Sequence, residues 1–146
     1  MSEALFHCGM EAVVDLVGGK WKLLILFHLS SKRRRFGELR RLVGGVSEKM
    51  LSQHLKEMVR DGLVRRLDFQ TVPPHVEYEL EDFGADLGRA LRPVCQWGTR
   101  NMDTIAAIAE ARDSKKAAVA GNSVRTSQTV KASRVNRAGS SKISKQ

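Results

Sequence analysis

The stretch from Ser47 to Asp61 carries side chains that could do hydrogen-bond chemistry along one side of a helix. Its apolar residues fall on one helical face, whereas the other face holds Glu48, Lys49, Ser52, Gln53 and Lys56. A Gln amide can pair with two atoms of adenine and a Lys ammonium can reach guanine, which suits Gln53 and Lys49 to reading base edges. An ordinary solvated face would have a similar composition, so this interpretation depends on the elements around the helix.

No pattern typical of a catalytic or metal site accompanies this helix. The glycine pairs at 18–19 and 44–45 are two-residue helix stops and not phosphate-binding loops, and no Ser, His and acid set or carboxylate pair suits catalysis. The four His are scattered, and the two Cys lack the Cys-x-x-Cys spacing of metal sites. We therefore expect a protein that is not an enzyme and that has no metal site and no cofactor.

Cys8 is a separate candidate for chemistry, as a redox sensor. It lies just before the first expected helix, where amide donors and the positive helix end can favour the reactive thiolate. Cys95 lies on the apolar stripe of the last expected helix and is either buried filler or a partner for Cys8 of the other subunit. The alternative for Cys8 is a small, partly buried residue without chemistry.

The net charge of +9 lies almost entirely in the C-terminal part of the chain. Residues 114–146 have eight Lys or Arg and no acid, whereas residues 1–113 have 17 bases against 16 acids. The tail has no aromatic residue and no sustained apolar period, so we expect 1–113 to fold and 114–146 to be a disordered basic tail. Such a tail can raise non-specific DNA affinity through counterion release, although a solvated, dispensable extension would have the same composition.

The chain also lacks the signals of export and membrane insertion. No apolar run approaches the roughly 18 residues that span a bilayer, and acids stand near the N-terminus where a secretory signal would have a basic stretch. We therefore expect a cytoplasmic protein with no membrane partner.

The elements that must position the polar helix follow from the periodicity of the apolar residues. Helical spacing predicts helices over 10–17, 20–29, 36–43 and 47–61, and alternation predicts strands over 63–69 and 76–81 that form a hairpin. From Asp82 the apolar residues recur at steps of three or four, which predicts a long last helix that Pro93 kinks or divides. This helix has more apolar surface than one small domain covers, so we expect a subunit interface there.

Three blocks of the sequence together resemble the HxlR-type regulators, relatives of the MarR group. The blocks read GGKWKLLILFHL, RRRFGELRRLVGGVSEKMLSQHLKEMVRDGLVRR and VPPHVEYELEDFG, and Trp97 follows them. The resemblance runs from about Cys8 to Trp97 and implies a mostly helical α+β fold. This fold is a winged helix-turn-helix with a two-stranded wing and a long C-terminal dimerisation helix. Some regulators of this type sense oxidants or electrophiles through an N-terminal cysteine.

The function that the resemblance implies is transcriptional regulation by a homodimer that binds double-stranded DNA at a palindromic operator, with repression the expected sign. A helix-turn-helix lays its second helix in the major groove, while the first helix crosses the phosphate backbone. Carried over by position, the groove-facing residues are Ser47, Lys49, Ser52, Gln53 and Lys56. The residues that would meet phosphates or the minor groove are Arg35, Arg65, Arg66 and the loop from Gln70 to His75. The candidates for the dimer interface are Val13, Leu91, Val94, Trp97, Met102 and Ile105.

Three alternatives stay open at this point. A non-specific architectural protein that acts through the basic tail would show a steep salt dependence and little sequence dependence. A winged helix can also serve protein contacts alone when its outward face has lost its donors. Arg65 and Arg66 can pair with Glu77 or Glu79 across the hairpin instead of with DNA.

The chain departs from the family pattern at Lys49, where Arg is frequent, and at Glu81, where a capping Thr is usual. An oxidant or small-molecule effector stays unknown.

Overall fold

The computed structural model describes residues 5–135, with side chains described as far as residue 120. It divides into two units, the first ending at Pro93 and the second beginning at Val94. The first unit opens with the helices α1 (Gly9–Val17), α2 (Lys20–Leu29), α3 (Phe36–Val43) and α4 (Glu48–Arg60). The strands are β1 (Arg34–Arg35), β2 (Val64–Asp68) and β3 (Val76–Leu80), and the last helices are α5 (Asp82–Arg100) and α6 (Met102–Val135). The four leading helices and the hairpin that were predicted are therefore confirmed, to within one or two residues at their ends.

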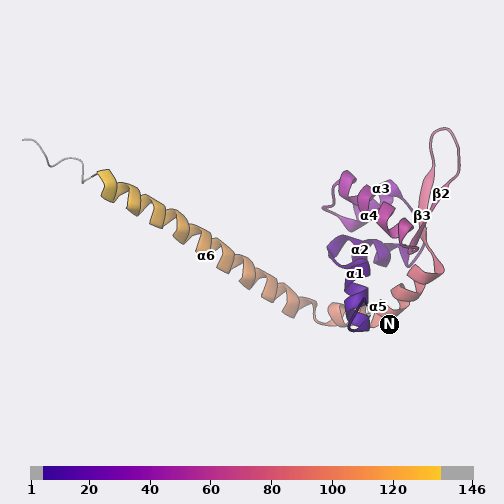
Figure 1. Cartoon of the computed structure of the whole chain (residues 1–146), viewed down its shortest axis with the longest axis horizontal. Coiled ribbons are helices and arrows are strands. Elements are labelled where there is room, and N and C mark those ends of the chain that lie inside the picture. Colours follow the sequence, from indigo (N-terminus) through magenta and orange to yellow (C-terminus); the bar gives the residue numbers. More distant parts are fainter. Residues whose placement is uncertain (1–4, 136–146) are drawn as a thin grey trace, which may run out of the picture. The chain divides into compact units, whose positions relative to one another are not determined.

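The sheet is antiparallel, with the strand order β1-β3-β2. Strands β2 and β3 pair from Val64 opposite Leu80 to Asp68 opposite Val76, and the loop between them extends beyond the helices as a wing (Figure 1). The two-stranded wing was predicted, but β1 was not, because the sequence analysis placed no helix or strand between residues 29 and 36. A strand of two residues is too short to show alternation, and β1 is defined by its pairing of Arg34 with Tyr78.

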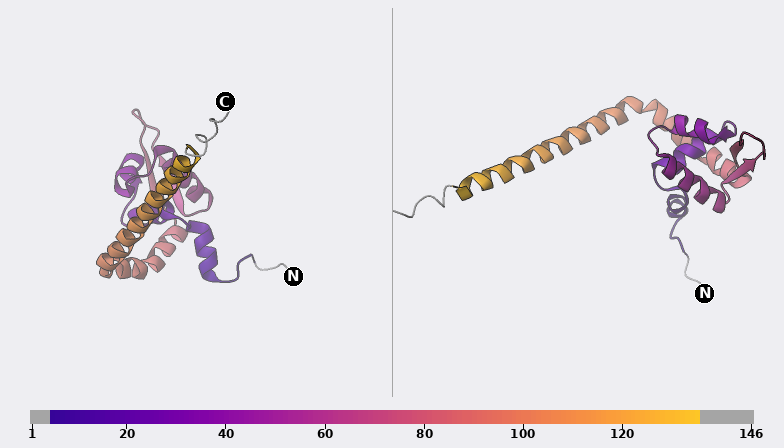
Figure 2. Two further views of the ribbon diagram at one scale, coloured as in Figure 1. Left: turned by 90° about the vertical axis from the view of Figure 1, so that its left-hand side faces the viewer. Right: turned by 90° about the horizontal axis from the view of Figure 1, so that it is seen from above.

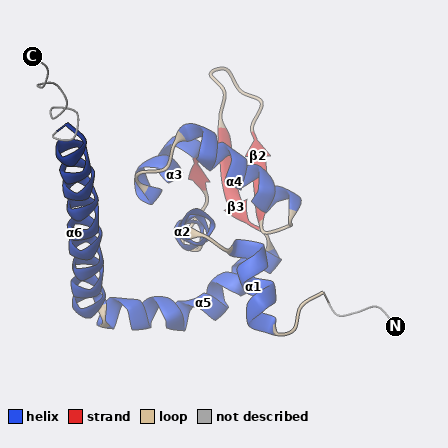
Figure 3. Ribbon diagram, turned by 60° about the vertical axis from the view of Figure 1, so that its left-hand side comes forward, coloured by secondary structure: helices blue, strands red, loops and turns tan. Residues whose placement is uncertain are grey.

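The core of the first unit gathers around α2. Ile25 of α2, Leu39 of α3 and the α4 residues Leu51 and Met58 are completely buried. Figure 3 shows α2 with α3, α4 and the sheet around it. Burial of each such side chain contributes roughly 1.5–3 kcal/mol, so the apolar face of α4 fixes which of its faces remains outside.

The last two helices separate at Asn101 and not at Pro93, which lies inside α5. The Asn101 side chain donates to the Trp97 carbonyl oxygen at 2.8 Å, and the Asn101 carbonyl accepts from the Ile105 amide at 3.0 Å. The Trp97 carbonyl also accepts from the Asn101 backbone amide at 3.1 Å, so the side-chain bond marks the junction of the two helices without replacing this helical bond.

α6 continues as one helix to Val135, as both views of Figure 2 show. It therefore runs through 114–135, a stretch whose composition predicted disorder. That stretch has no proline and is rich in Ala, Lys and Arg, which have high helix propensity. The remainder of the predicted tail, 136–146, lies outside the described residues, and the division of the chain at 113 stays a prediction.

The element order and the wing confirm the predicted fold class, a mostly helical α+β winged helix-turn-helix. Within residues 5–135, no helix combines the length and the apolar character that crossing a membrane requires.

Candidate nucleic-acid interface

A sharp turn between α3 and α4 sets the direction of the polar helix. Gly44 and Gly45 have φ angles of 65° and 71°, in the left-handed region that glycine adopts without a steric penalty. After this turn, the Ser47 hydroxyl accepts a hydrogen bond from the Met50 amide at 3.1 Å and caps α4, as the sequence predicted. The Ser47 hydroxyl is therefore engaged within the protein. Its main effect on the polar face is to fix the start of α4, and not to bind DNA as a free acceptor.

The exposed face of α4 brings the predicted groove residues together. Lys49, Gln53 and Lys56 are exposed and Ser52 is half-buried, whereas Leu51, Leu55 and Met58 are buried on the opposite face. Residues three and four apart on a helix are neighbours, so Lys49, Gln53 and Lys56 form one continuous polar surface. This surface can donate hydrogen bonds and carries two positive charges.

Glu57 adds a contact to this surface that the sequence analysis missed. The Gln53 amide nitrogen donates to Glu57 Oε1 at 3.0 Å, and Lys22 Nζ of α2 lies 2.8 Å from Glu57 Oε2. The hydrogen bonds from Lys22 and Gln53 lower the pKa of Glu57 from 4.5 to about 2. His54 Nδ1 also lies 3.6 Å from this carboxylate. The i, i+4 spacing of Gln53 and Glu57 could have suggested the first contact, but Lys22 is distant in sequence.

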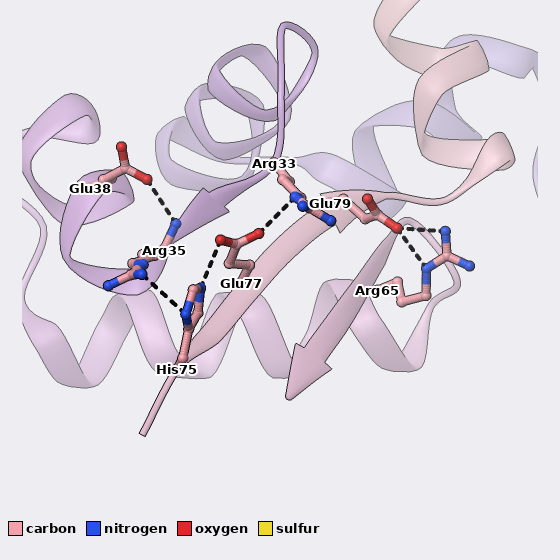
Figure 4. Close-up of polar contacts among 7 residues, drawn as sticks. All are labelled: Arg33, Arg35, Glu38, Arg65, His75, Glu77 and Glu79. Atoms are coloured by element: carbon pink, nitrogen blue, oxygen red, sulfur yellow. Dashed lines mark hydrogen bonds and ion pairs between the residues drawn. The ribbon is translucent and has the colours of Figure 1, made fainter. Parts of the chain in front are cut away.

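A second network joins β1 and the start of α3 to the base of the wing (Figure 4). Arg35 Nη2 lies 3.0 Å from His75 Nδ1, and His75 Nε2 lies 2.8 Å from Glu77 Oε1. Arg33 Nε completes the chain at 2.8 Å from Glu77 Oε2. A guanidinium can only donate, so in this contact His75 Nδ1 is the acceptor and Nε2–H donates to Glu77.

The wing-base network changes what His75 and Arg35 can do. The pKa of Glu77 is lowered, first by the hydrogen bond from His75 and then by the positive charges of Arg33 and Arg35. His75 was predicted to contact DNA, but both of its ring nitrogens are occupied within the protein. Arg35 is exposed and has further N–H groups, so it can meet a phosphate while His75 holds one of its nitrogens.

Arg65 and Arg66 are held by acids on the wing strands. Arg65 donates to Glu79 Oε1 from Nη2 at 2.6 Å and from Nε at 3.0 Å, the cross-strand pair that the alternative interpretation predicted (Figure 4). Arg66 Nη1 instead lies 3.3 Å from Asp68 Oδ2 on its own strand. In the ladder Arg66 stands opposite Tyr78, which explains why it does not pair with Glu77 or Glu79.

The predicted dimer residues differ in how far they are covered. Trp97, Val94, Met102 and Ile105 are exposed, with 55% of Trp97 and 60% of Met102 accessible. Val13 and Leu91 are half-buried and pack against the core of the first unit. These four exposed side chains are large and apolar, so covering them would lower the free energy.

Cys8 and Cys95 are both exposed and free. Cys8 caps α1, since its Sγ accepts from the Glu11 amide at 3.5 Å. Within the single chain neither thiol is buried, so Cys95 is not a filler of this chain's own core.

Comparison with known proteins gives this geometry a context. The family described as HxlR-like helix-turn-helix matches residues 16–106. The chain is 38% identical over 105 residues to YtcD of Bacillus subtilis (strain 168), an HTH-type transcriptional regulator, with 72% of this chain and 83% of YtcD covered. Among solved structures it is similar to the redox regulator HypR in its reduced form, with 35% identity, a TM-score of 0.64, and 68% and 99% of the two chains covered. It is also similar to diamide-treated YodB from B. subtilis, with 28% identity, a TM-score of 0.55, and 66% and 96% covered.

Proposed function

The chain belongs to the HxlR-like helix-turn-helix family of transcriptional regulators, and we propose that it acts there as a homodimeric repressor that binds a palindromic operator. In this proposal α4 enters the major groove of double-stranded DNA, and the wing and Arg35 meet the adjacent backbone. Two copies related by twofold symmetry would read two half-sites one helical turn apart.

The observation that carries the proposal is the exposed surface formed by Lys49, Gln53 and Lys56. It lies on a helix whose opposite face is fixed in the core, with a capped start and a wing after it. A winged helix that served only protein contacts would have no need of an ammonium and an amide at these groove-facing positions. We therefore assign base reading to Gln53 and Lys49.

Selection of bound sequences from random DNA by the full chain tests this assignment. We expect an enriched palindromic sequence, and the double variant Lys49→Ala, Gln53→Ala should lose about 1–3 kcal/mol of discrimination for each base contact removed. The control variant Lys116→Ala, Gln96→Ala removes the same charge and the same amide from exposed positions of α6 and α5. Normal selection of the operator by the Lys49, Gln53 variant would refute the assignment.

The architectural alternative predicts a different dependence on salt and sequence. Removal of residues 114–146 takes away eight of the nine net positive charges. If α4 reads the operator, the shortened chain should keep its preference for operator over random DNA while its overall affinity falls and depends less on salt. An architectural protein would instead lose most binding and show no preference before or after the truncation.

We further infer that the regulator responds to oxidants through Cys8. The support is the exposed position of both thiols and the similarity to HypR, a redox regulator, and to YodB, which was studied after diamide treatment. Diamide would take two electrons and two protons from the Cys8 thiol and the Cys95 thiol of the second subunit, forming one S–S bond between the subunits.

Non-reducing electrophoresis after diamide treatment tests this response. We expect a crosslinked dimer that a thiol reductant reverses and that Cys8→Ser and Cys95→Ser each abolish. Operator affinity should change in the treated wild type and not in either variant. The absence of a crosslink together with an unchanged affinity would end the sensor proposal.

A further inference from the structure

Resting on the proposed DNA-binding function, we propose that Glu57 is a positioning residue that fixes the Gln53 amide for reading adenine, and that Lys22 holds Glu57 in place. Gln53 would touch the base, whereas Glu57 and Lys22 act through it. Glu57 and Lys22 would thereby set base specificity, which the fold and the exposed Lys49 and Lys56 alone do not determine.

The three side chains form a continuous chain of contacts from the core helix to the polar face of α4. Lys22 Nζ lies 2.8 Å from Glu57 Oε2, and Gln53 Nε2 donates to Glu57 Oε1 at 3.0 Å. The Lys22 and Glu57 side chains are only 13% and 25% exposed. Lys22 is carried by α2, which also holds the buried Ile25 and Leu26, so Glu57 is anchored to a helix of the core.

The charge of Glu57 decides which way the Gln53 amide faces. An ionised carboxylate only accepts hydrogen bonds, and the lowered pKa of Glu57, about 2, keeps it ionised at neutral pH. The amide must therefore turn its nitrogen toward Glu57 and its carbonyl oxygen away. A flip of the amide would lose this bond and bring the carbonyl oxygen against a carboxylate.

The fixed amide leaves a defined edge for the duplex. Its nitrogen has two hydrogens, one of which is taken by Glu57, so the amide keeps its carbonyl oxygen as an acceptor and one N–H as a donor for the duplex. Adenine presents a donor at N6 and an acceptor at N7, which complement this edge, whereas guanine presents two acceptors at O6 and N7. Without Glu57, the Gln53 amide could donate both hydrogens to the O6 and N7 acceptors of guanine. Glu57 therefore makes Gln53 prefer adenine over guanine.

The test compares the DNA sequences selected by the full-length wild type with those selected by Glu57→Ala. We expect the adenine preference at one base pair of each half-site to fall about tenfold, with guanine gaining, while the other positions keep their preferences. Glu110→Ala is the matched control, because it removes the same charge from an exposed position of α6, outside the polar face of α4. It should change the overall affinity without changing the base preference.

Two further variants separate positioning from a loss of stability. Lys22→Met keeps the length of the side chain and removes its charge, so it should relax the same base pair in the same direction. In a Gln53→Ala background, Glu57→Ala should cause no further change in base preference. A general loss of stability would not produce this non-additivity, and urea unfolding of each variant shows whether it is folded.

The outcomes distinguish this inference from the proposed function. If the wild type selects no sequence, the proposed function itself fails. If Gln53→Ala removes the preference at one base pair while Glu57→Ala and Lys22→Met both retain it, the positioning role is overturned and the proposed function stands. Equal weakening on all sequences by both of these variants also overturns the positioning role.

Discussion

At the scale of single residues, the charge of Glu57 ties the stability of the fold to pH. Lys22 and Gln53 hold the pKa of Glu57 near 2 in the folded chain, against 4.5 for a free side chain. As the pH falls through this interval, the unfolded chain takes up a proton that the folded chain does not. The stabilisation from Glu57 is therefore complete above about pH 5 and is lost toward about pH 2.

Glu57→Gln should make the free energy of unfolding less sensitive to acid between about pH 5 and pH 2, because the variant has no proton to take up at this position. Urea unfolding at a series of pH values measures this slope. Asp86→Asn is the control, since Asp86 forms an exposed pair with Arg89 at 3.1 Å and should leave the slope nearly unchanged. Identical slopes for Glu57→Gln and the wild type would contradict the assigned pKa.

The sequence was enough to predict which residues of α4 are exposed, but not which side chains contact one another at the wing. Helical spacing was enough to place Lys49, Gln53 and Lys56 on one face, because a buried apolar face defines the opposite one. The engagement of His75 by Arg35 and Glu77 could not be predicted, because it depends on how β1 pairs with β3. An imidazole with both nitrogens occupied is a property of the packed network and leaves no signal in the local sequence.

At the scale of elements, α4 depends on the cap that Ser47 provides. Its hydroxyl accepts from the Met50 amide at 3.1 Å, and without it that donor in the first turn would need water. Ser47→Ala should therefore lower the free energy of unfolding by about 0.5–2 kcal/mol. Ser52→Ala, in the body of the same helix, should cost less, since Ala has the higher helix propensity and no cap is lost. Equal costs in urea unfolding would argue against the cap.

The start of α5 is docked through a close approach of backbone to backbone. A Cβ at Gly84 would overlap the carbonyl oxygen of Leu63, which also accepts from the Glu81 amide at 3.0 Å. The added Cβ and the Leu63 carbonyl are both fixed to backbone, so the overlap can be relieved only by moving the start of α5 away from the Leu63 backbone.

Gly84→Ala should therefore destabilise the fold by about 1–3 kcal/mol despite the better helix propensity of alanine. Gly37→Ala in α3 is the matched control, because a Cβ there meets nothing within 4 Å, and it should be neutral or slightly stabilising. Thermal unfolding measures both variants, and a stable Gly84→Ala protein would show that α5 is not held at this point.

Some boundaries of the helices and strands could be predicted from the sequence and others could not. The hairpin and the four leading helices follow from apolar periodicity and glycine stops, which are local signals. The division between α5 and α6 does not, because Pro93 is the stronger breaker by type but Asn101 bonds the Trp97 carbonyl at the actual break. The helix over 114–135 was also missed, because low hydrophobicity is a criterion for packing and not for helical backbone.

At the scale of the whole molecule, the large apolar side chains on α5 and α6 support assembly. Val94, Trp97, Met102 and Ile105 are large, apolar and exposed within two consecutive helices, and exposed apolar side chains that gather in one region are typical of an interaction site. Operator binding by two copies also requires that the pair form before or on the DNA, because one helix-turn-helix reads only one half-site. Assembly and DNA affinity should therefore be lost together.

In the proposed dimer, Trp97 is covered by the second subunit, so Trp97→Glu should give a monomer in sedimentation equilibrium, because dimerisation would bury a carboxylate. Its operator affinity should fall by about a hundredfold or more, since the second half-site no longer binds as part of the same particle. Gln96→Glu adds the same charge at an exposed neighbouring position of α5 and should leave both measurements nearly unchanged. A Trp97→Glu protein that stays dimeric, or a monomer with full operator affinity, would show that this surface does not join the two DNA-reading units.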